Sequence, residues 1–573
     1  MRLWTALVVL APTLTLLPTC RHPQSAGIRL TGRDAEPTGI AGFAWHDKFI
    51  EAQISPKGTY LAAIVNEGGR RSLVFIDLVK RQFSSRITPD SESMVGSYYW
   101  ANDERVVVEL VDQDGSLAKP VSRGELYAVN ATGRDGRLVF GYRHGDREIS
   151  WIRNRQNLGL GHRLPNDNKE VFVEAISVEN REDSAIQLYR LNVYNGKKRF
   201  VGQTPLLATE VLADENGDPR IASGFDETLT QRFFYRAGAQ GWIELTRLKG
   251  FTNQSAAIAF SSRDRTVYVS EQGEGIFGVY AVNIDSGDRR RLSKNDTVPP
   301  SSFVIDPATR RVLAVEYEPD LPVYDFLLPD HPLCRAMAGL LVAYPGHHVR
   351  LMNTTDDGKK AVFWAYSDRD PGQFLLVDVE RFMAEPLVSV RPWIRSEQMS
   401  EVAALHIAAS DGMKIHGYLT LPQSNHPGLP PPLVVLPHGG PHFVRDHWGF
   451  NPEVQLLAKE GFAVLQVNYR GSGGYGLKYE QAGYRNWDSR IVQDIIDGTR
   501  YVPADNADQI RARVLLIHGL QGNRAPLEHA EKLKGALAKA GQKSGMDPGA
   551  PRRAWLLHTK EEPEVPGRPA SMP

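Results

Sequence analysis

The chain has 573 residues, which is too long for a single hydrophobic core, so we expect at least two domains. Apolar residues make up 42% and charged residues 23%, as in ordinary soluble globular proteins. Lys plus Arg and Asp plus Glu both number 67, and no long basic run occurs, so the composition argues against nucleic acid or a charged membrane surface as a partner.

Residues 1–22 are typical of a secretory signal peptide. Arg2 precedes an apolar stretch, Leu3–Leu17, which has the length of a signal-peptide core and is too short to span a bilayer stably. We therefore expect export from a bacterial cytoplasm, to the periplasm or the medium. Residues 17–20 loosely resemble a lipoprotein processing site, which leaves two alternatives, a lipid anchor on Cys20 or an ordinary cleaved signal. No later segment is apolar enough to predict a transmembrane helix.

Cysteine is too rare to organise the fold. The chain holds two cysteines, Cys20 and Cys334. If Cys20 is removed or lipidated, Cys334 has no partner, so the sequence argues against a disulfide framework and against a cysteine-based metal site.

From about residue 40 to residue 399, short β-rich runs alternate with turns. In the first unit, residues 54–62 and 71–77 read as turn, strand, turn, strand, and the last five units begin 40 to 48 residues apart. The later units begin near Tyr99, Val171, Leu212, Phe260, Val304 and Met352. A repeat of this length predicts a β-propeller, here with seven blades, because radial repetition protects the sheet edges. The alternative is a pair of all-β sandwiches.

Polar residues of this repeat region are interpreted as structural. Asp264 and Asp285 fall in turn sequences, where a carboxylate commonly bonds its own backbone. No propeller residue is assigned a catalytic role.

After residue 400, strand patterns alternate with helix patterns. The expected elements are a hairpin of Leu405–Ala409 and Ile415–Leu421 around the turn Ser410–Gly412, helices at Ile491–Tyr501 and Leu527–Ala540, and strands at Arg513–Gly519 and Ala554–Leu557. This alternation predicts an α/β domain with a largely parallel sheet over residues 401–562. The Pro-rich tail, residues 563–573, is expected to be disordered.

The most informative stretch runs from Val434 to Gly476. An apolar run ends in His438-Gly439-Gly440-Pro441, a helix-like segment follows at Pro452–Glu460, and a second apolar run ends in the Gly-rich sequence 471–476. This is a β–loop–α–β unit, which predicts two buried parallel strands with functional loops at their carboxyl ends.

The same stretch resembles the start of the catalytic domain of the prolyl oligopeptidase family of serine peptidases, in the branch of acylaminoacyl and dipeptidyl peptidases. The residues that carry the resemblance are His438–Pro441, Trp448–Phe450, Gln466–Gly476 and Val514–Gly519, with the hairpin Asp411–Pro422 at the join to the propeller. The resemblance covers nearly the whole chain and implies a β-propeller followed by an α/β-hydrolase that cleaves peptides.

One element of the expected active site is present. In the family, the second Gly of His-Gly-Gly-Pro offers its backbone N–H to the oxyanion, and this position is Gly440. Glycine suits the role because substrate and backbone must approach closely. The competing interpretation of Gly440 is an ordinary strand-to-loop turn.

The nucleophile is missing from the sequence. An α/β-hydrolase carries its Ser in a G-x-S-x-G turn, and this pattern does not occur in residues 401–573. The resemblance implies that about a hundred residues around this turn are lacking between Val502 and Pro503. Ser472 is interpreted as a decoy, since Arg470 stands where the turn requires Gly and its loop follows an earlier strand.

The other two triad members are also missing. Gly522 occupies the position at which the family carries the catalytic Asp, and glycine cannot orient an imidazole. The match to the last strand stops at about Glu562, immediately before the expected His, and His558 is interpreted as a strand residue.

No cofactor is expected, and no metal site is predicted. His438, His442 and His447 lie close together in the sequence, but their spacing is not that of a metalloprotease helix and no acidic cluster accompanies them.

Three interpretations remain open. The chain is a serine peptidase by descent that has lost catalysis, an active hydrolase with an unforeseen nucleophile, or a propeller-based binding protein with a decayed hydrolase domain. An incorrect gene sequence would also account for the missing elbow. Peptides are the expected substrates or ligands, and the oligomeric state, substrate preference and lipidation stay open.

Overall fold

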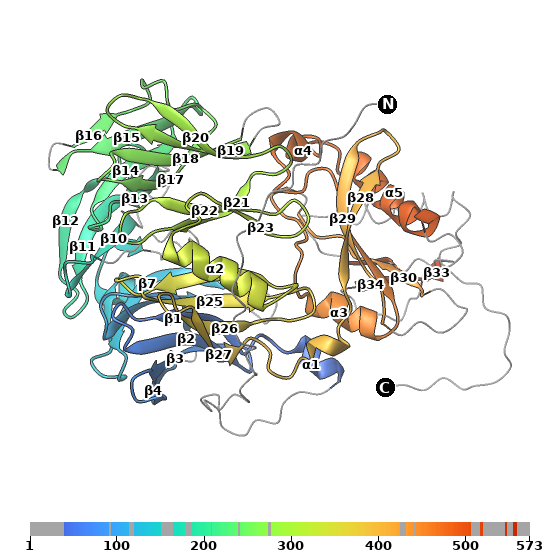
Figure 1. Cartoon of the computed structure of the whole chain (residues 1–573), viewed down its shortest axis with the longest axis horizontal. Helices are drawn as coiled ribbons and strands as arrows, with labels where there is room; N and C mark the ends of the chain where they lie inside the picture. The colour runs from blue at the N-terminus through green and yellow to red at the C-terminus, as the bar shows by residue number, and fades with distance from the viewer. Residues whose placement is uncertain are drawn as a thin grey trace, which may run out of the picture.

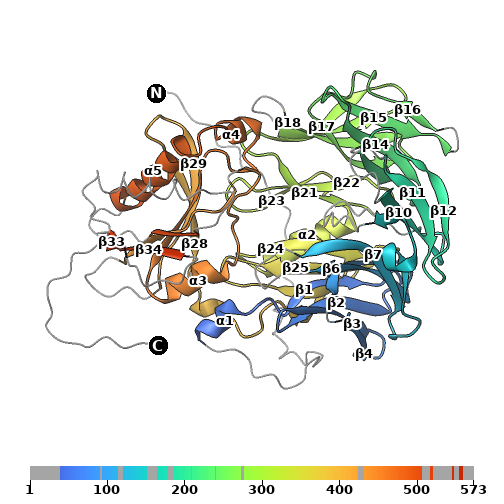
Figure 2. The ribbon, with the colours of Figure 1, turned by 180° about the vertical axis from the view of Figure 1, so that it is seen from behind.

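The computed structural model describes residues 39–558 except 91–92, 114–119, 151–163, 178–184, 208, 239–240, 273–276, 424–430, 441, 506–515, 520–544 and 547–553. The expected signal peptide with Cys20, the helix at Leu527–Ala540, Gly522 and the tail 563–573 therefore lie outside the described residues. Figures 1 and 2 show two parts, a ring of sheets on one side and a smaller α/β region on the other.

The first part is a seven-bladed β-propeller, as the repeat predicts. In the described residues its first four sheets are four-stranded and antiparallel. Their strands are β1 (Phe49–Ile54), β2 (Tyr60–Glu67), β3 (Arg70–Asp77), β4 (Gln82–Ile87), β5 (Met94–Trp100), β6 (Arg105–Asp112), β7 (Val121–Asn130), β8 (Arg137–Phe140), β9 (Glu148–Ser150), β10 (Glu170–Ser177), β11 (Gln187–Asn192), β12 (Lys198–Gln203), β13 (Thr209–Ala213), β14 (Pro219–Phe225), β15 (Gln231–Arg236) and β16 (Trp242–Glu244). Two short helical segments join them, α1 (Ile40–Ala44) before the first sheet and the 3₁₀ turn Tyr142–His144.

The remaining three sheets complete the ring. In the described chain the fifth and seventh have four strands and the sixth has three. Their strands are β17 (Ser255–Ser261), β18 (Thr266–Gln272), β19 (Phe277–Asn283), β20 (Arg289–Asn295), β21 (Pro300–Ile305), β22 (Val312–Tyr317), β23 (Val323–Phe326), β24 (His348–Thr354), β25 (Lys360–Tyr366), β26 (Gln373–Asp378) and β27 (Met383–Ser389). The 3₁₀ turn Ser396–Gln398 leads out of the propeller.

In three of the blades, the turn between the third and fourth strands is closed by the same kind of side-chain hydrogen bond. The side-chain oxygens of Asp77, Asn192 and Asn283 each accept hydrogen bonds from the backbone N–H groups two and three residues later. Such bonds favour a tight turn over continued strand, which explains why the repeat could be recognised without sequence identity between its units.

Asp264 and Asp285 lie near turns, but they do not bond their own backbone as the sequence predicted. The Asp264 carboxylate accepts two hydrogen bonds from Arg311, at 2.6 and 2.8 Å, and so links the fifth sheet to the sixth. Asp285 binds Arg265 inside the fifth sheet. A planar guanidinium matches a carboxylate better than two separate amides do, and sequence alone does not reveal which arginine is near.

The ring closes through side-chain bonds between its first and last sheets. Asn353 on β24 accepts from the N–H of Ile54 at 2.9 Å and donates to the carbonyl oxygen of Ile54 at 2.7 Å. Phe49, Ile54 and Phe374 belong to one buried apolar cluster that joins these two sheets. The propeller therefore has continuous packing around the ring.

One helix interrupts the β pattern. The sequence predicted strands throughout, but α2 (Pro332–Ala343) follows β23. Leu333, Cys334 and Met337 pack against strands of the sixth and seventh sheets. Cys334 is a free, buried thiol, and burial raises its pKa to about 11, so it is a packing residue.

The second part begins with a four-stranded sheet in the order β28 (Val402–Ala408), β29 (Lys414–Thr420), β31 (Ala463–Asn468), β30 (Leu433–Val435). Strands β30 and β31 are parallel and joined by α3 (Pro452–Lys459), which confirms the predicted β–α–β unit. Asn451 caps α3 by accepting from the N–H groups of Glu453 and Val454. Two further helices, α4 (Leu477–Gln481) and α5 (Arg490–Asp505), follow.

The expectation of a largely parallel sheet is wrong for the described residues. There, β30 and β31 form the parallel pair, while β28–β29 and β29–β31 are antiparallel. A second sheet, β32 (Leu516–Gly519), β34 (Ala554–His558) and β33 (Gly545–Met546), is also antiparallel. Parallel pairing requires a crossover connection, and a hairpin gives the antiparallel arrangement. Within the described residues, no helix is both long and apolar enough to cross a membrane.

Candidate functional site

The loop after β30 carries the predicted oxyanion residue. Its first residue still pairs with the sheet, because the N–H of Leu436 donates to the carbonyl oxygen of Leu465. The His438 ring stacks on Tyr469 with centroids 4.4 Å apart, and the Tyr469 hydroxyl donates to the His438 carbonyl oxygen at 2.8 Å. Gly440 is exposed with φ of 143°, a conformation that favours glycine. Gly440 is thus exposed on a loop that Tyr469 anchors at His438.

Ser472 lies beside His438, with 2.8 Å between its Oγ and the imidazole Nε2. A Ser–His contact of this length is what a nucleophile and its base would show. Ser472 is fully buried, however, and its hydroxyl donates to the carbonyl oxygen of Tyr469 at 2.7 Å. A hydroxyl has one proton to give, and the Tyr469 carbonyl competes for it with His438, whose Nδ1 lies 2.9 Å from the carbonyl oxygen of Gly439 and whose Nε2 faces Ser472.

The Gly-rich run after β31 is a close-packing surface. A Cβ at Gly476 would clash with the ring of Phe277, which comes from β19 of the propeller, and the Gly476 φ is 89°. A Cβ at Gly473 would meet the backbone of Phe443 at 2.9 Å. These glycines are therefore explained by packing between segments, including one contact across the two parts of the chain.

Arg470, at the end of β31, ties three segments together. Its guanidinium binds Asp494 on α5 at 2.7 and 2.8 Å and Asp411 in the hairpin turn at 2.8 and 3.0 Å. Asp494 is completely buried, and Arg470 is 6% exposed. The hydrogen bond from Arg470 lowers the pKa of Asp411 to about 2. The arginine that rules out a nucleophile elbow at Ser472 is therefore a structural anchor.

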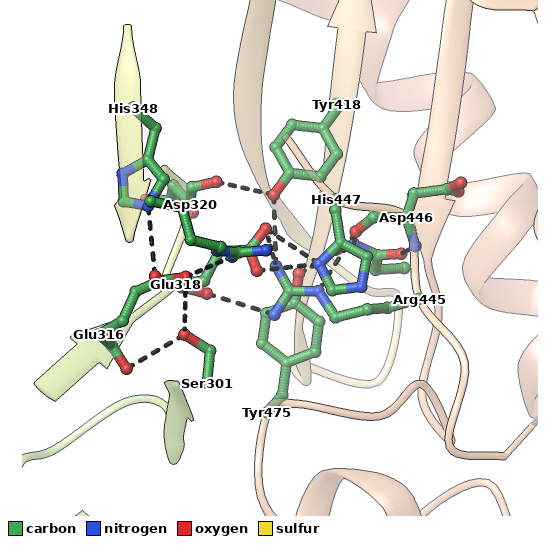
Figure 3. A network of polar contacts seen from close by, with 12 residues as sticks. Ser301, Glu316, Glu318, Asp320, His348, Tyr418, Arg445, Asp446, His447 and Tyr475 are labelled. Atoms are coloured by element: carbon green, nitrogen blue, oxygen red, sulfur yellow. Dashed lines mark hydrogen bonds and ion pairs between the residues drawn. The ribbon is translucent and has the colours of Figure 1, made fainter. Parts of the chain in front are cut away.

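A polar network joins the propeller to the α/β region (Figure 3). Arg445 lies over the Tyr475 ring at 4.3 Å, and it is 3.8 Å from the carboxylate of Glu318. The same carboxylate binds His447 Nδ1, which lies 3.0 and 2.9 Å from its two oxygens. The Tyr418 hydroxyl donates to the carbonyl oxygen of Asp320 at 2.7 Å. Both parts thus contribute charged groups to one interface.

Glu316, two residues before Glu318 in the chain, is buried inside the propeller. It accepts from Arg350 at 2.7 Å and from the Tyr324 hydroxyl at 2.9 Å, and His348 Nε2 lies 3.3 Å away. Burial raises the pKa of this carboxyl, but the bonds and charges of His348 and Arg350 outweigh it and hold the pKa at about 2. Glu316 is therefore ionised and compensated at neutral pH.

The three loop histidines do not converge. His438 contacts Ser472, His442 accepts from the indole N–H of Trp487 at 3.1 Å, and His447 binds Glu318. Burial lowers the pKa of His438, which keeps its ring neutral. These contacts agree with the interpretation of the three residues as separate loop side chains.

Comparisons with known proteins identify the family. The model of the prolyl oligopeptidase family matches residues 448–506. Dipeptidyl aminopeptidase BIII of Pseudoxanthomonas mexicana is 24% identical over 549 residues, covering 91% of this chain and 73% of that protein. The chain belongs to the prolyl oligopeptidase family.

Two further matches support the prolyl oligopeptidase assignment locally and in fold. Dipeptidyl peptidase family member 6 of Caenorhabditis elegans is 31% identical over 159 residues, 24% of this chain and 21% of that protein. A solved puromycin-hydrolyzing peptidase of Mycobacterium tuberculosis has the same fold, with a TM-score of 0.56 and 15% identity over 84% of this chain and 75% of its own. The chain thus spans about three quarters of the two relatives that match it along most of its length.

Sequence reasoning missed the acidic residues at the interface of this prolyl oligopeptidase relative. Glu316, on β22, and Glu318 and Asp320, just after its end, are three acidic residues at alternate positions of the sequence. That alternation was a readable signal. His558 ends β34, as its interpretation as a strand residue predicted, whereas Gly522, the predicted position of the lost acid, lies outside the described residues.

Proposed function

We propose that this member of the prolyl oligopeptidase family binds peptides without hydrolysing them. The observation that carries the proposal is the lack of a G-x-S-x-G sequence after residue 400. Gly522 at the expected acid position and the end of the match before the expected His support it. Loss of any one triad member already removes most of the rate, and loss of all three leaves binding and the oxyanion donor.

The geometry around Ser472 also supports this proposal. Ser472, which lies at hydrogen-bond distance from His438, is fully buried, and the Tyr469 carbonyl competes with the imidazole for its hydroxyl proton. The retained loop around Gly440 agrees with a site that could still hold a peptide carbonyl. Peptides are the expected ligands because the family acts on them.

The second candidate is an active hydrolase that uses Ser472, and the 2.8 Å contact to His438 favours it. Activity would require the Ser472 hydroxyl to turn from Tyr469 to the imidazole and to become accessible. The third candidate, a binding protein that recognises its partner through the propeller alone, differs from our proposal in making the Gly440 loop unnecessary.

Labelling with a serine-reactive fluorophosphonate tests the proposal on the full chain. We expect no labelled serine and no hydrolysis of acyl-peptide or dipeptide chromogens, together with measurable binding of unlabelled peptides by calorimetry. Labelling that disappears in Ser472→Ala would support the second candidate. Peptide binding that is unchanged in Gly440→Val would favour the third.

Export remains part of the proposal. The apolar stretch Leu3–Leu17 supports secretion, and Cys20 supports the alternative, in which the exported protein carries a lipid anchor. Mass spectrometry of the mature amino terminus distinguishes the two, since a lipid on Cys20 adds mass that an ordinary cleaved signal does not leave.

A further inference from the structure

Two histidines face each other across the hairpin that opens the α/β region. His406 on β28 and His416 on β29 are direct register partners, five residues on either side of Asp411. Their ring centroids are 5.3 Å apart with planes at 81°. Directly opposite residues of an antiparallel pair project from the same face of the sheet. The hairpin therefore presents two imidazoles together.

The propeller supplies a carboxylate to the same place. Asp320, which follows β22, lies with one oxygen 3.1 Å from His406 Nε2. One donor atom from each of Asp320, His406 and His416 lies within 4.8 Å of the others. The Asp320 backbone is held by the hydroxyl of Tyr418, two residues beyond His416 on β29 (Figure 3). Three groups from two parts of the chain thus converge.

His416 is fixed in orientation and has an unused nitrogen. Its ring stacks on Tyr475 with centroids 4.2 Å apart and planes at 10°, and the Tyr479 ring packs against it at 5.8 Å. The Nδ1 atom of His416 is buried without a hydrogen-bond partner among the described residues. A buried polar atom without a partner costs free energy, and a metal ion is one group that would remove this cost.

We propose that Asp320, His406 and His416 bind a divalent transition-metal ion of the zinc class, which bridges the propeller and the α/β region. Two imidazoles and a carboxylate are a typical zinc donor set, whereas calcium and magnesium prefer oxygen ligands. Metal–ligand distances of about 2.0–2.2 Å place tetrahedral donor atoms about 3.4 Å apart. The separation of Asp320 from His406 already meets this requirement, and the remaining separations, which are at most 4.8 Å, would shorten when the ion binds.

The ion would have a structural task. His406 is exposed, which leaves room for water as the fourth ligand. The positive charge of nearby Arg445 opposes a cation, but Glu318 lies 3.8 Å from that guanidinium and Asp320 brings a further negative charge. A bound ion would join the hairpin to the propeller segment after β22 and so fix the two parts relative to each other. This replaces the sequence expectation of no metal site.

The alternative is an ordinary His–Asp ion pair beside a buried neutral histidine. The propeller offers a matched example, because His347 Nε2 lies 3.1 Å from Asp370, the same separation as in His406–Asp320. Among the described residues, the group of Asp320, His406 and His416 is the one in which three such donors come this close. His347→Gln is therefore the control for losing a His–Asp contact without a third ligand.

The test uses the full chain, purified without a histidine tag, stripped with EDTA and dialysed against ZnCl₂ or CoCl₂. We expect one equivalent of zinc by mass spectrometry of the metal, and with cobalt the intense visible absorption of a tetrahedral site. His406→Gln and Asp320→Asn should each weaken zinc binding by about tenfold or more, since even outer partners of a metal matter by 10–100-fold. His347→Gln should leave zinc binding unchanged.

His416→Ala is avoided as the sole variant because the buried ring supports packing; His406→Gln, at an exposed position, keeps the proposal testable. Zinc binding below one tenth of an equivalent, or equal zinc affinity in His406→Gln, Asp320→Asn and His347→Gln, would overturn the proposal. Neither result bears on peptide hydrolysis, so this test is independent of the proposed function.

Discussion

Glu51 shows how a single buried carboxyl sets a pH dependence. It lies on β1, is 8% exposed, and its carboxylate accepts from Gln53 at 2.5 Å. Burial raises its pKa from 4.5 to about 7, against the opposing effect of the Gln53 bond. Between these two values the folded state binds more protons than the unfolded state, so this group makes the protein less stable as the pH rises from about 4.5 to 7.

Glu51→Gln should remove that penalty. A shift of about 2.5 pH units corresponds to about 3 kcal/mol, fully present above pH 7 and absent below about pH 4. We expect the variant to gain stability over the wild type at pH 8 and much less at pH 5, measured as the midpoint of urea unfolding. The exposed Glu385→Gln is the control. An equal gain at both pH values would contradict the assigned pKa.

At the residue scale, sequence predicted some features and missed others for a physical reason. The motif around Gly440 and the unsuitability of Ser472 were visible because both depend on neighbours in the chain. The burial of Glu51, the pairing of Glu316 with Arg350 and the convergence on His416 depend on segments far apart in sequence. The register partnership of His406 and His416 could have been found, because both lie five residues from the centre of a predicted turn.

At the element scale, Arg470 decides how β31, α5 and the β28–β29 turn hold together. Arg470→Met would leave the fully buried Asp494 carboxyl without its cationic partner, which we expect to cost about 3–5 kcal/mol in the free energy of unfolding. Chemical denaturation monitored by tryptophan fluorescence measures this loss.

Arg490→Met is the matched control for this prediction. Arg490 is half-exposed and lies 3.4 Å from the same Asp411, so its loss should cost about 0–1 kcal/mol. The double variant Arg470→Met, Asp494→Leu should recover part of the loss, because it removes the orphaned carboxyl. Equal stability of Arg470→Met and Arg490→Met would contradict the prediction, because burial of the Arg470–Asp494 pair would then add nothing to the free energy of unfolding.

The elements themselves were largely predictable. The β–α–β unit, the hairpin and α5 follow from periodicity, caps and turns, which are local. Helix α2 was missed because its apolar residues also fit the surrounding strand pattern and only the packing between two sheets selects a helix. The extent of parallel strand pairing was overestimated, because strand direction depends on the connections between strands and a strand pattern carries no direction.

At the scale of the whole molecule, the two parts differ in how completely their sheets are supported. Each propeller sheet packs between two others, and Asn353 closes the ring onto Ile54. In the α/β region the described sheet ends at β30, a strand of three residues, and a separate antiparallel sheet contains strands of four, five and two residues. Edge strands and short strands leave backbone groups that no ladder partner satisfies.

We therefore expect the region after residue 400 to be less stable than the propeller. Limited proteolysis of the full chain should first yield a resistant fragment that ends near residue 400, identified by mass spectrometry, because local opening exposes the least supported segments first. The variant Asn353→Ala, cleaved under the same conditions, tests whether ring closure makes the propeller resistant. Opening the ring should make the propeller fragment short-lived as well. If the wild-type region after residue 400 resists cleavage as long as the propeller does, the short sheets are compensated by the shared interface at Glu318 and Arg445, and the proposed difference in stability is wrong.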